Sequence, residues 1–132
     1  MLARSLAFAL VLAVGASTAI PLFAHHSFSA EFDSNKRIQL TGVITSVKWQ
    51  NPHVYFYIDV KDERGKTTNY AVEMGSPNGV LNNGLSRDIL KVGMVVSLNG
   101  TMAKDGSPKV NSRDIMVNGK RFDAASSEGV TP

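Results

Sequence analysis

Three histidines offer the most distinctive chemistry in this 132-residue chain. His25 and His26 are adjacent, and His53 directly follows a proline. A neutral imidazole nitrogen is a good ligand for transition metals. The chain has no cysteine, which excludes a thiolate metal site, a disulfide and a cysteine nucleophile. The residue types therefore predict that any metal site is built from His25, His26 and His53.

A secretory leader is predicted to precede the first two histidines. Residues 1–24 carry one charge, Arg4, followed by an apolar and small-residue stretch that ends in Leu22-Phe23-Ala24. A basic start, an apolar centre and a small residue at the cut are typical of a signal peptide. The pattern predicts a periplasmic or secreted protein. An earlier cut near Ala19 and an uncleaved leader that anchors the protein in a membrane are alternatives.

Cleavage after Ala24 would give His25 a free α-amine beside its own imidazole. An α-amine has an unperturbed pKa of about 7.7–8.0, so a metal ion can displace its proton at neutral pH. The amine and Nδ1 would form a chelate, and His26 or His53 would add a further nitrogen. Such a donor set suits Cu(II) best among the divalent ions, with Ni(II) and Zn(II) next.

Other side chains could complete a ligand site around His53. Carboxylates could supply oxygen, a thioether would favour Cu(I), and aromatic rings could stack a sugar or a base. The candidates are Glu31, Asp33, Glu73, Met74, Asn51 and Tyr55. Structural roles remain open for all of them. Histidines after a leader can be solvated, and a histidine after proline can simply cap a strand.

Alternating apolar residues predict five strands, over residues 38–49, 53–60, 67–74, 94–98 and 110–117. A phase change beside Gly42 predicts a bulge in the first strand. Between the third and fourth strands, Ser76-Pro77 predicts the capped start of a short helix. This order is that of the oligonucleotide/oligosaccharide-binding (OB) fold. We expect an all-β fold with a short helical insert, a five-stranded OB-like Greek-key barrel; an open sandwich is the alternative.

The expected organisation is a signal peptide over residues 1–24, an N-terminal segment over 25–36, an OB-like domain over 37–122 and a disordered tail over 123–132. Without the leader, 13 basic residues face 11 acidic ones, a net charge of +2. Nucleic-acid binders usually show a clustered basic face. The sequence therefore predicts no nucleic-acid partner, and a membrane partner only through an uncleaved leader.

Three stretches resemble an uncharacterised family of small exported bacterial proteins, a domain of unknown function. They are AHHSF at residues 24–28, NPH at 51–53 and VEMGSPNG at 72–79. The resemblance implies a secreted or periplasmic location and a small β-barrel. It implies no activity.

Two hypotheses for the function follow. The first is a periplasmic metal-binding protein, with copper favoured, that uses His25, His26 and His53. The second is a metal-free OB-type module that binds a peptide, a glycan or a partner protein. An enzyme is not expected, because no serine has a recognisable nucleophile context and no phosphate-cradling pattern is present.

We expect intact mass spectrometry of the exported protein to give the mass of the 108 residues from His25 to Pro132. Cleavage after Ala24 would create the amino-terminal chelate. The mass of the whole chain, or of one cut near Ala19, would contradict the predicted leader boundary and would leave the first two histidines internal.

Overall fold

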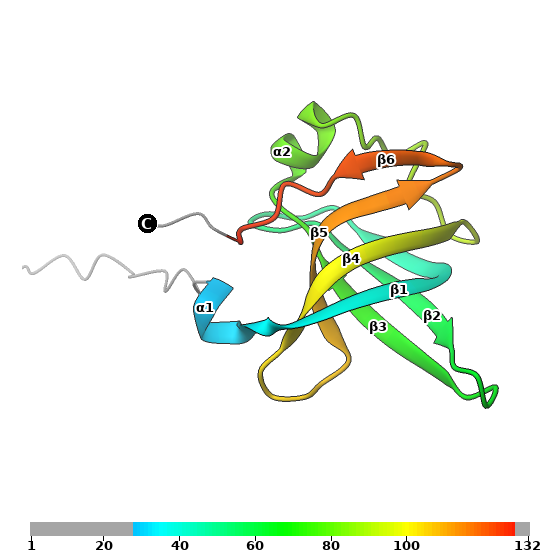
Figure 1. The fold of residues 1–132 in the computed structure, drawn as a ribbon. Coiled ribbons are helices and arrows are strands. Elements are labelled where there is room, and N and C mark those ends of the chain that lie inside the picture. Colours follow the sequence, from blue (N-terminus) through cyan, green and yellow to red (C-terminus); the bar gives the residue numbers. More distant parts are fainter. Residues whose placement is uncertain (1–27, 129–132) are drawn as a thin grey trace, which may run out of the picture.

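The computed structural model describes residues 28–128, and their fold is mostly β with two short helices (Figure 1). His25, His26 and the predicted leader lie outside the described residues. No helix within residues 28–128 is long and apolar enough to cross a bilayer. The elements are α1 (Phe28–Glu31), β1 (Phe32–Lys48), β2 (Tyr55–Lys61), β3 (Thr67–Glu73), α2 (Pro77–Asn82), β4 (Val95–Ala103), β5 (Lys109–Val117) and β6 (Lys120–Asp123).

The strand pairings close into a ring of five, β1–β2–β3–β5–β4–β1. β1 pairs with both β2 and β4, β4 pairs with β5, and all of these pairs are antiparallel. The ring closes where β5 runs parallel to β3 over a short stretch, Ala71–Glu73 against Lys109–Asn111. β6 then folds back on β5. The predicted mostly-β fold with a helical insert is confirmed, while β6 is a sixth strand that the sequence did not predict.

β1 is longer than predicted and bends at a different place. It starts at Phe32, and its register against β2 shifts between Ile44 and Ser46, rather than beside Gly42. Gly42 points inward like Leu40 and Ile44, but it has no side chain. The alternation of apolar residues therefore continues through Gly42, although the sequence suggests a break there. A Cβ on Gly42 would lie 2.5 Å from the carbonyl oxygen of Asp59. The glycine therefore lets β2 approach β1 closely.

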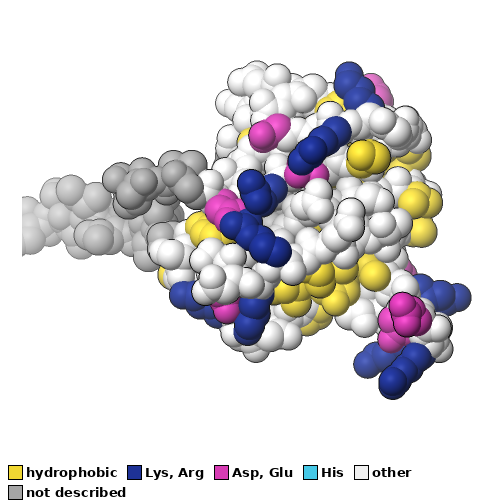
Figure 2. Space-filling view, viewed as in Figure 1, with side chains coloured by type: hydrophobic (Ala, Val, Ile, Leu, Met, Phe, Trp, Pro, Cys, Tyr) yellow, Lys and Arg dark blue, Asp and Glu magenta, His cyan; other side chains and the backbone are white. Residues whose placement is uncertain are grey.

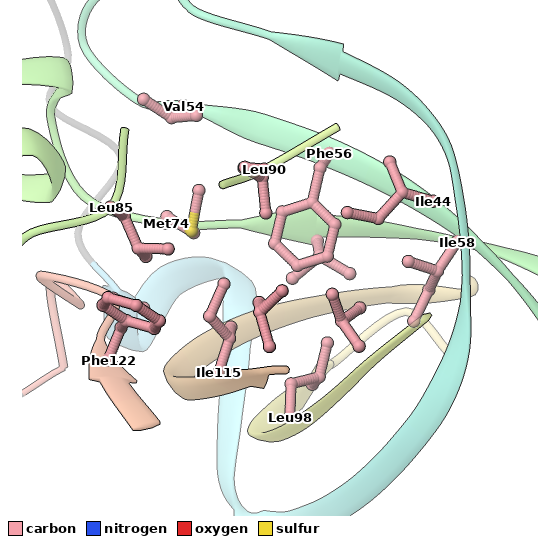
Figure 3. Packing of buried hydrophobic residues seen from close by; sticks show 14 of the residues in the cluster. Ile44, Val54, Phe56, Ile58, Met74, Leu85, Leu90, Leu98, Ile115 and Phe122 are labelled. Atoms are coloured by element: carbon pink, nitrogen blue, oxygen red, sulfur yellow. The ribbon is translucent and has the colours of Figure 1, made fainter. Parts of the chain in front are cut away.

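The core fills the inside of this closed sheet. Figure 3 shows side chains from β1, β2, β4 and β5 pointing toward one another, with Phe56 among them. Residues of α2 and the loop that follows it complete the same cluster: Val80, Leu85 and Leu90. Burying a large apolar side chain contributes roughly 1.5–3 kcal/mol. This core holds the strand ends that carry the site described below.

The helix α2 begins as predicted. Ser76 is its N-cap, with a side chain that accepts a hydrogen bond from the backbone N–H of Gly79 at 3.1 Å, and Pro77 takes the first helical position. Proline suits that position because its missing N–H would be unpaired there in any case. Just before the cap, Met74 and Gly75 are held beside β2 by backbone hydrogen bonds to Val54, both at 2.9 Å.

The described part of the chain after β6 packs against the sheet, although the sequence predicts a disordered tail from Asp123. Ala124 is fully buried. Its N–H donates to the carbonyl of Arg113 at 3.1 Å, and its own carbonyl accepts from Gly75 N–H at 2.8 Å. The small residues of this segment give no sign of packing in the sequence. In the structure they fit against Gly75, which has no side chain to block them.

We expect Gly42→Ala to lower the free energy of unfolding by about 1–3 kcal/mol, the usual cost of forcing extra atoms into a packed site. Urea denaturation measures this change. Gln39→Ala, exposed on the same strand, is the matched control and should change stability by about 0.5 kcal/mol or less. Equal effects of the two substitutions would contradict the close approach of β2 to Gly42.

Candidate functional site

His53 lies just before β2 and is held by the backbone that follows β3. Its Nδ1 is 3.1 Å from the carbonyl oxygen of Met74. A carbonyl can only accept, so in the neutral ring Nδ1 carries the hydrogen and Nε2 keeps its lone pair. That Nε2 lies 3.9 Å from Oε1 of Glu73. The backbone thus orients the second ring nitrogen of His53 toward a carboxylate.

Glu73 is a buried acidic residue, with its side chain only 5% exposed. Strand register brings its partners to it, because Tyr55 on β2 and Asn111 on β5 are both its direct cross-strand neighbours. The hydroxyl of Tyr55 donates to Oε2, and Nδ2 of Asn111 donates to Oε1 at 3.2 Å. Lys109 Nζ lies 3.6 Å from Oε2. A buried charge needs such partners to offset its desolvation.

Lys109 links this carboxylate to a second one. Its ammonium group forms an ion pair with Glu31, at the end of α1, as well as with Glu73. It also lies over the rings of Phe32 and Tyr55, 5.6 and 5.4 Å from their centroids. The ion pairs join the first described residues of the chain to the site.

The electrostatics of the cluster favour a charged lysine and a neutral tyrosine. Burial lowers the pKa of Lys109, but its hydrogen bond to Glu31 and the attraction of Glu31 and Glu73 outweigh it, so the pKa is raised overall. Burial and the hydrogen bond to Glu73 raise the pKa of the Tyr55 hydroxyl. Tyr55 therefore stays a neutral hydrogen-bond donor to the carboxylate.

The structure brings together four of the predicted candidates: His53, Tyr55, Glu73 and, through Lys109, Glu31. The Asp33 carboxylate instead accepts a hydrogen bond from the N–H of Asn35 and contacts Lys36. Asn51 is exposed in the turn before His53. Met74 is fully buried in the core (Figure 3), and its backbone carbonyl, rather than its sulfur, contacts His53.

Lys109 and Asn111 belong to the cluster and were not predicted. Within residues 28–128, no three histidine, cysteine or acidic side chains gather closely enough to hold a metal ion. The described part of the chain therefore offers a His53–Glu73 pair, and the predicted partners His25 and His26 lie outside it.

Solved structures with a similar fold are OB-type proteins. Two crystal forms of the mitochondrial single-stranded DNA-binding protein Rim1 from S. cerevisiae superpose with a TM-score of 0.50 each, at 13% and 16% sequence identity. Each match covers 66% of this chain and 94% or 93% of Rim1. The N-terminal domain of PriB from Thermoanaerobacter tencongensis is also similar, with a TM-score of 0.43, 19% identity, and coverage of 63% of this chain and 96% of that one. The Rim1 matches support the OB-like fold.

The chain itself belongs to the family of unknown function DUF6152, which it matches over residues 13–112. This confirms the predicted membership of an uncharacterised family. No curated protein matches the sequence.

The predicted exclusion of a nucleic-acid partner is wrong. The fold neighbours are named as single-stranded DNA-binding proteins, which overturns an exclusion drawn from net charge. A net charge of +2 averages over the whole surface and says nothing of how basic side chains are arranged on it. Fold and charge distribution, rather than the sum of charges, govern contact with phosphates.

We expect Asn111→Ala to lower the free energy of unfolding by about 1–3 kcal/mol, because Glu73 would lose a buried hydrogen-bond donor. Urea denaturation gives the value. Asn99→Ala is the control, since the Asn99 amide also bonds a carboxylate, that of Asp114, but at an exposed position. That control should cost about 0.5 kcal/mol or less. If Asn99→Ala proves as costly, the Asn111 contact is not the one that stabilises the site.

Proposed function

We propose that this protein is an exported, OB-like barrel module that binds a transition-metal ion, with copper favoured. His53 and Glu73 would contribute one nitrogen and one oxygen ligand. His25 and His26 would supply the remaining nitrogens. Its role would be to buffer or deliver the ion, without a catalytic step.

The orientation of His53 carries the proposal. Histidines that bind metals almost always donate their other ring N–H to a carbonyl or a carboxylate, which fixes the ring and its tautomer. His53 makes this contact with the Met74 carbonyl. A histidine that merely capped the strand would need only that one hydrogen bond. It would have no need to direct its second nitrogen at a buried carboxylate.

The spacing of the two ligands is compatible with a shared ion. Metal–nitrogen and metal–oxygen bonds are roughly 2.0–2.2 Å long. The 3.9 Å between His53 Nε2 and Glu73 Oε1 is therefore within the span of two ligands on one ion. Mixed nitrogen and oxygen ligands suit Cu(II) and Ni(II).

A series of contacts links the start of the described chain to this pair. Phe28, its first residue, stacks on Phe32 with ring centroids 5.3 Å apart, and the ring of Phe32 lies under Lys109. Lys109 in turn contacts Glu73. His25 lies three positions before Phe28, and three residues span up to about 10 Å. This chain of contacts is the route by which we place the amino-terminal ligands near the site.

The alternative is a metal-free module. The cluster supports it too, because among residues 28–128 no buried side-chain nitrogen or oxygen lacks a hydrogen-bond partner. Single-stranded DNA, the ligand named for Rim1, joins a peptide and a glycan among its candidate ligands. Lys48 lies 5.2 Å from the ring centroid of Tyr57, on strands β1 and β2, and this pair is a place where a base could stack.

Titration calorimetry of the exported, processed protein with Cu(II), Ni(II) and Zn(II) tests the proposal. We expect submicromolar Cu(II) binding and weaker binding of the other two ions. His53→Ala and Glu73→Gln should each weaken Cu(II) binding by at least about 100-fold, since changes beyond the ligands alone already cost about 10–100-fold. His25→Ala should remove the chelate and weaken binding similarly.

Glu63→Gln, which removes an exposed carboxylate in the β2–β3 loop, is the matched control and should bind copper normally. Circular dichroism would confirm that each variant is folded. Copper binding that persists in folded His53→Ala would contradict the site, and absence of binding in the unchanged protein would leave the metal-free module.

A further inference from the structure

A second cluster of charged side chains lies on the side of the molecule that carries β1, β4 and β5. Figure 2 shows basic and acidic side chains next to one another on this side. There, Arg37 on β1 binds the carboxylate of Glu128 through both terminal nitrogens, one of them at 2.7 Å from Oε2. Arg113 Nε lies 3.7 Å from the same oxygen. Two arginines thus converge on one carboxylate.

A threonine completes the arrangement. The Thr101 hydroxyl lies 3.5 Å from Oε2 of Glu128 and accepts a hydrogen bond from Arg37 at 3.0 Å. The hydroxyl therefore fixes the guanidinium plane while it donates to the carboxylate. A planar guanidinium that meets a carboxylate through two parallel bonds is the strongest arrangement for such a pair.

The burial of the three charged groups differs. The Glu128 side chain is 16% exposed, while Arg37 and Arg113 are 46% and 57% exposed. A shallow depression of about 370 Å³ continues from the two arginines past Asn99 to Arg121. A ligand can therefore reach both arginines from solvent. In this structure, the carboxylate of Glu128 occupies the position that the carboxylate of a ligand would take.

Side-chain contacts hold the segment that carries Glu128. The Ser126 hydroxyl donates to Oδ1 of Asn111 and accepts from the Glu128 N–H at 3.0 Å. The two arginines are about half exposed, so water and salt compete with their ion pairs to Glu128. A competing carboxylate can therefore take the place of Glu128.

We propose that Arg37, Thr101 and Arg113 form a binding site for an acidic peptide segment of a partner protein, and that Glu128 occupies this site in the free protein. The site is shaped for a carboxylate, as the guanidinium fork and its present occupant indicate. Beside this site, Asn111 accepts a hydrogen bond from the Ser126 hydroxyl. A hydroxyl group of a bound peptide could be held in the same way. This site uses none of the proposed metal ligands.

The test uses full-length, processed protein and a fluorescent, acetylated tetraglutamate peptide as the probe, followed by anisotropy. We expect Glu128→Gln to bind the probe about tenfold more tightly than the unchanged protein, since it removes the internal competitor. Adding Arg37→Gln to that variant should abolish the gain, because the fork is lost. Arg113→Gln should reduce it.

Matched controls separate site binding from general attraction. Glu63→Gln changes the net charge as Glu128→Gln does, and Lys61→Gln changes it as Arg37→Gln does, but both lie at exposed positions outside the site. A gain with Glu63→Gln equal to that with Glu128→Gln would overturn the proposal. So would probe binding that survives Arg37→Gln, or labelled oligothymidine that binds Glu128→Gln more tightly than tetraglutamate does.

Discussion

The buried carboxylate of Glu73 is the constraint on which the rest of this structure depends. A charge that is only 5% exposed must find donors within the protein. Tyr55, Lys109 and Asn111 provide them from two strands, and both strands are neighbours of β3 in the closed ring. The short parallel pairing of β3 with β5 closes the sheet and also delivers Lys109 and Asn111 to Glu73. The strand pairing that closes the sheet therefore also assembles the site.

Asn111 joins the two charged clusters of the protein. Its side-chain N–H groups donate to Glu73 and to Ser127, and its oxygen accepts from Ser126. The amide is fully buried, and its bond to Glu73 is shielded from water, whereas the two serines are half-buried. A segment that leaves the arginines takes the serine contacts of Asn111 with it. The hydrogen bonding of Glu73 is thus linked to whatever occupies the arginine site.

The local elements could be predicted from the sequence because they depend on neighbouring residues. Ser76-Pro77 is sufficient to cap α2, and the alternation of Phe56 with Ile58 is sufficient to define β2. The position of the bulge could not be predicted, because Gly42 holds an inward position with no side chain to show it. The packing of Ala124 depends on a contact with Gly75, 49 residues away in the chain. Small residues carry no signal for such contacts.

The candidate site, like the fold, could be predicted only in part from the sequence. His53, Tyr55 and Glu73 could be proposed because their residue types and the turn before them suggest ligands. Lys109 and Asn111 could not, since only the pairing of β3 with β5, strands separated by α2 and β4, brings them to Glu73. From the sequence alone, a lysine at the start of a strand is indistinguishable from an ordinary solvated residue. Only the pairing of β3 with β5 shows that Lys109 lies beside Glu73.

The ion pairs of the site leave one carboxylate in excess. Two carboxylates, Glu31 and Glu73, share one ammonium group, that of Lys109. Counted without His53, these groups carry a formal charge of −1, and Glu73 lies where water screens charge poorly. A structural ion pair would be complete with one acid and one base, and replacing such a pair with apolar residues often costs nothing. An excess carboxylate beside an oriented imidazole nitrogen is instead the arrangement that the proposed cation would neutralise.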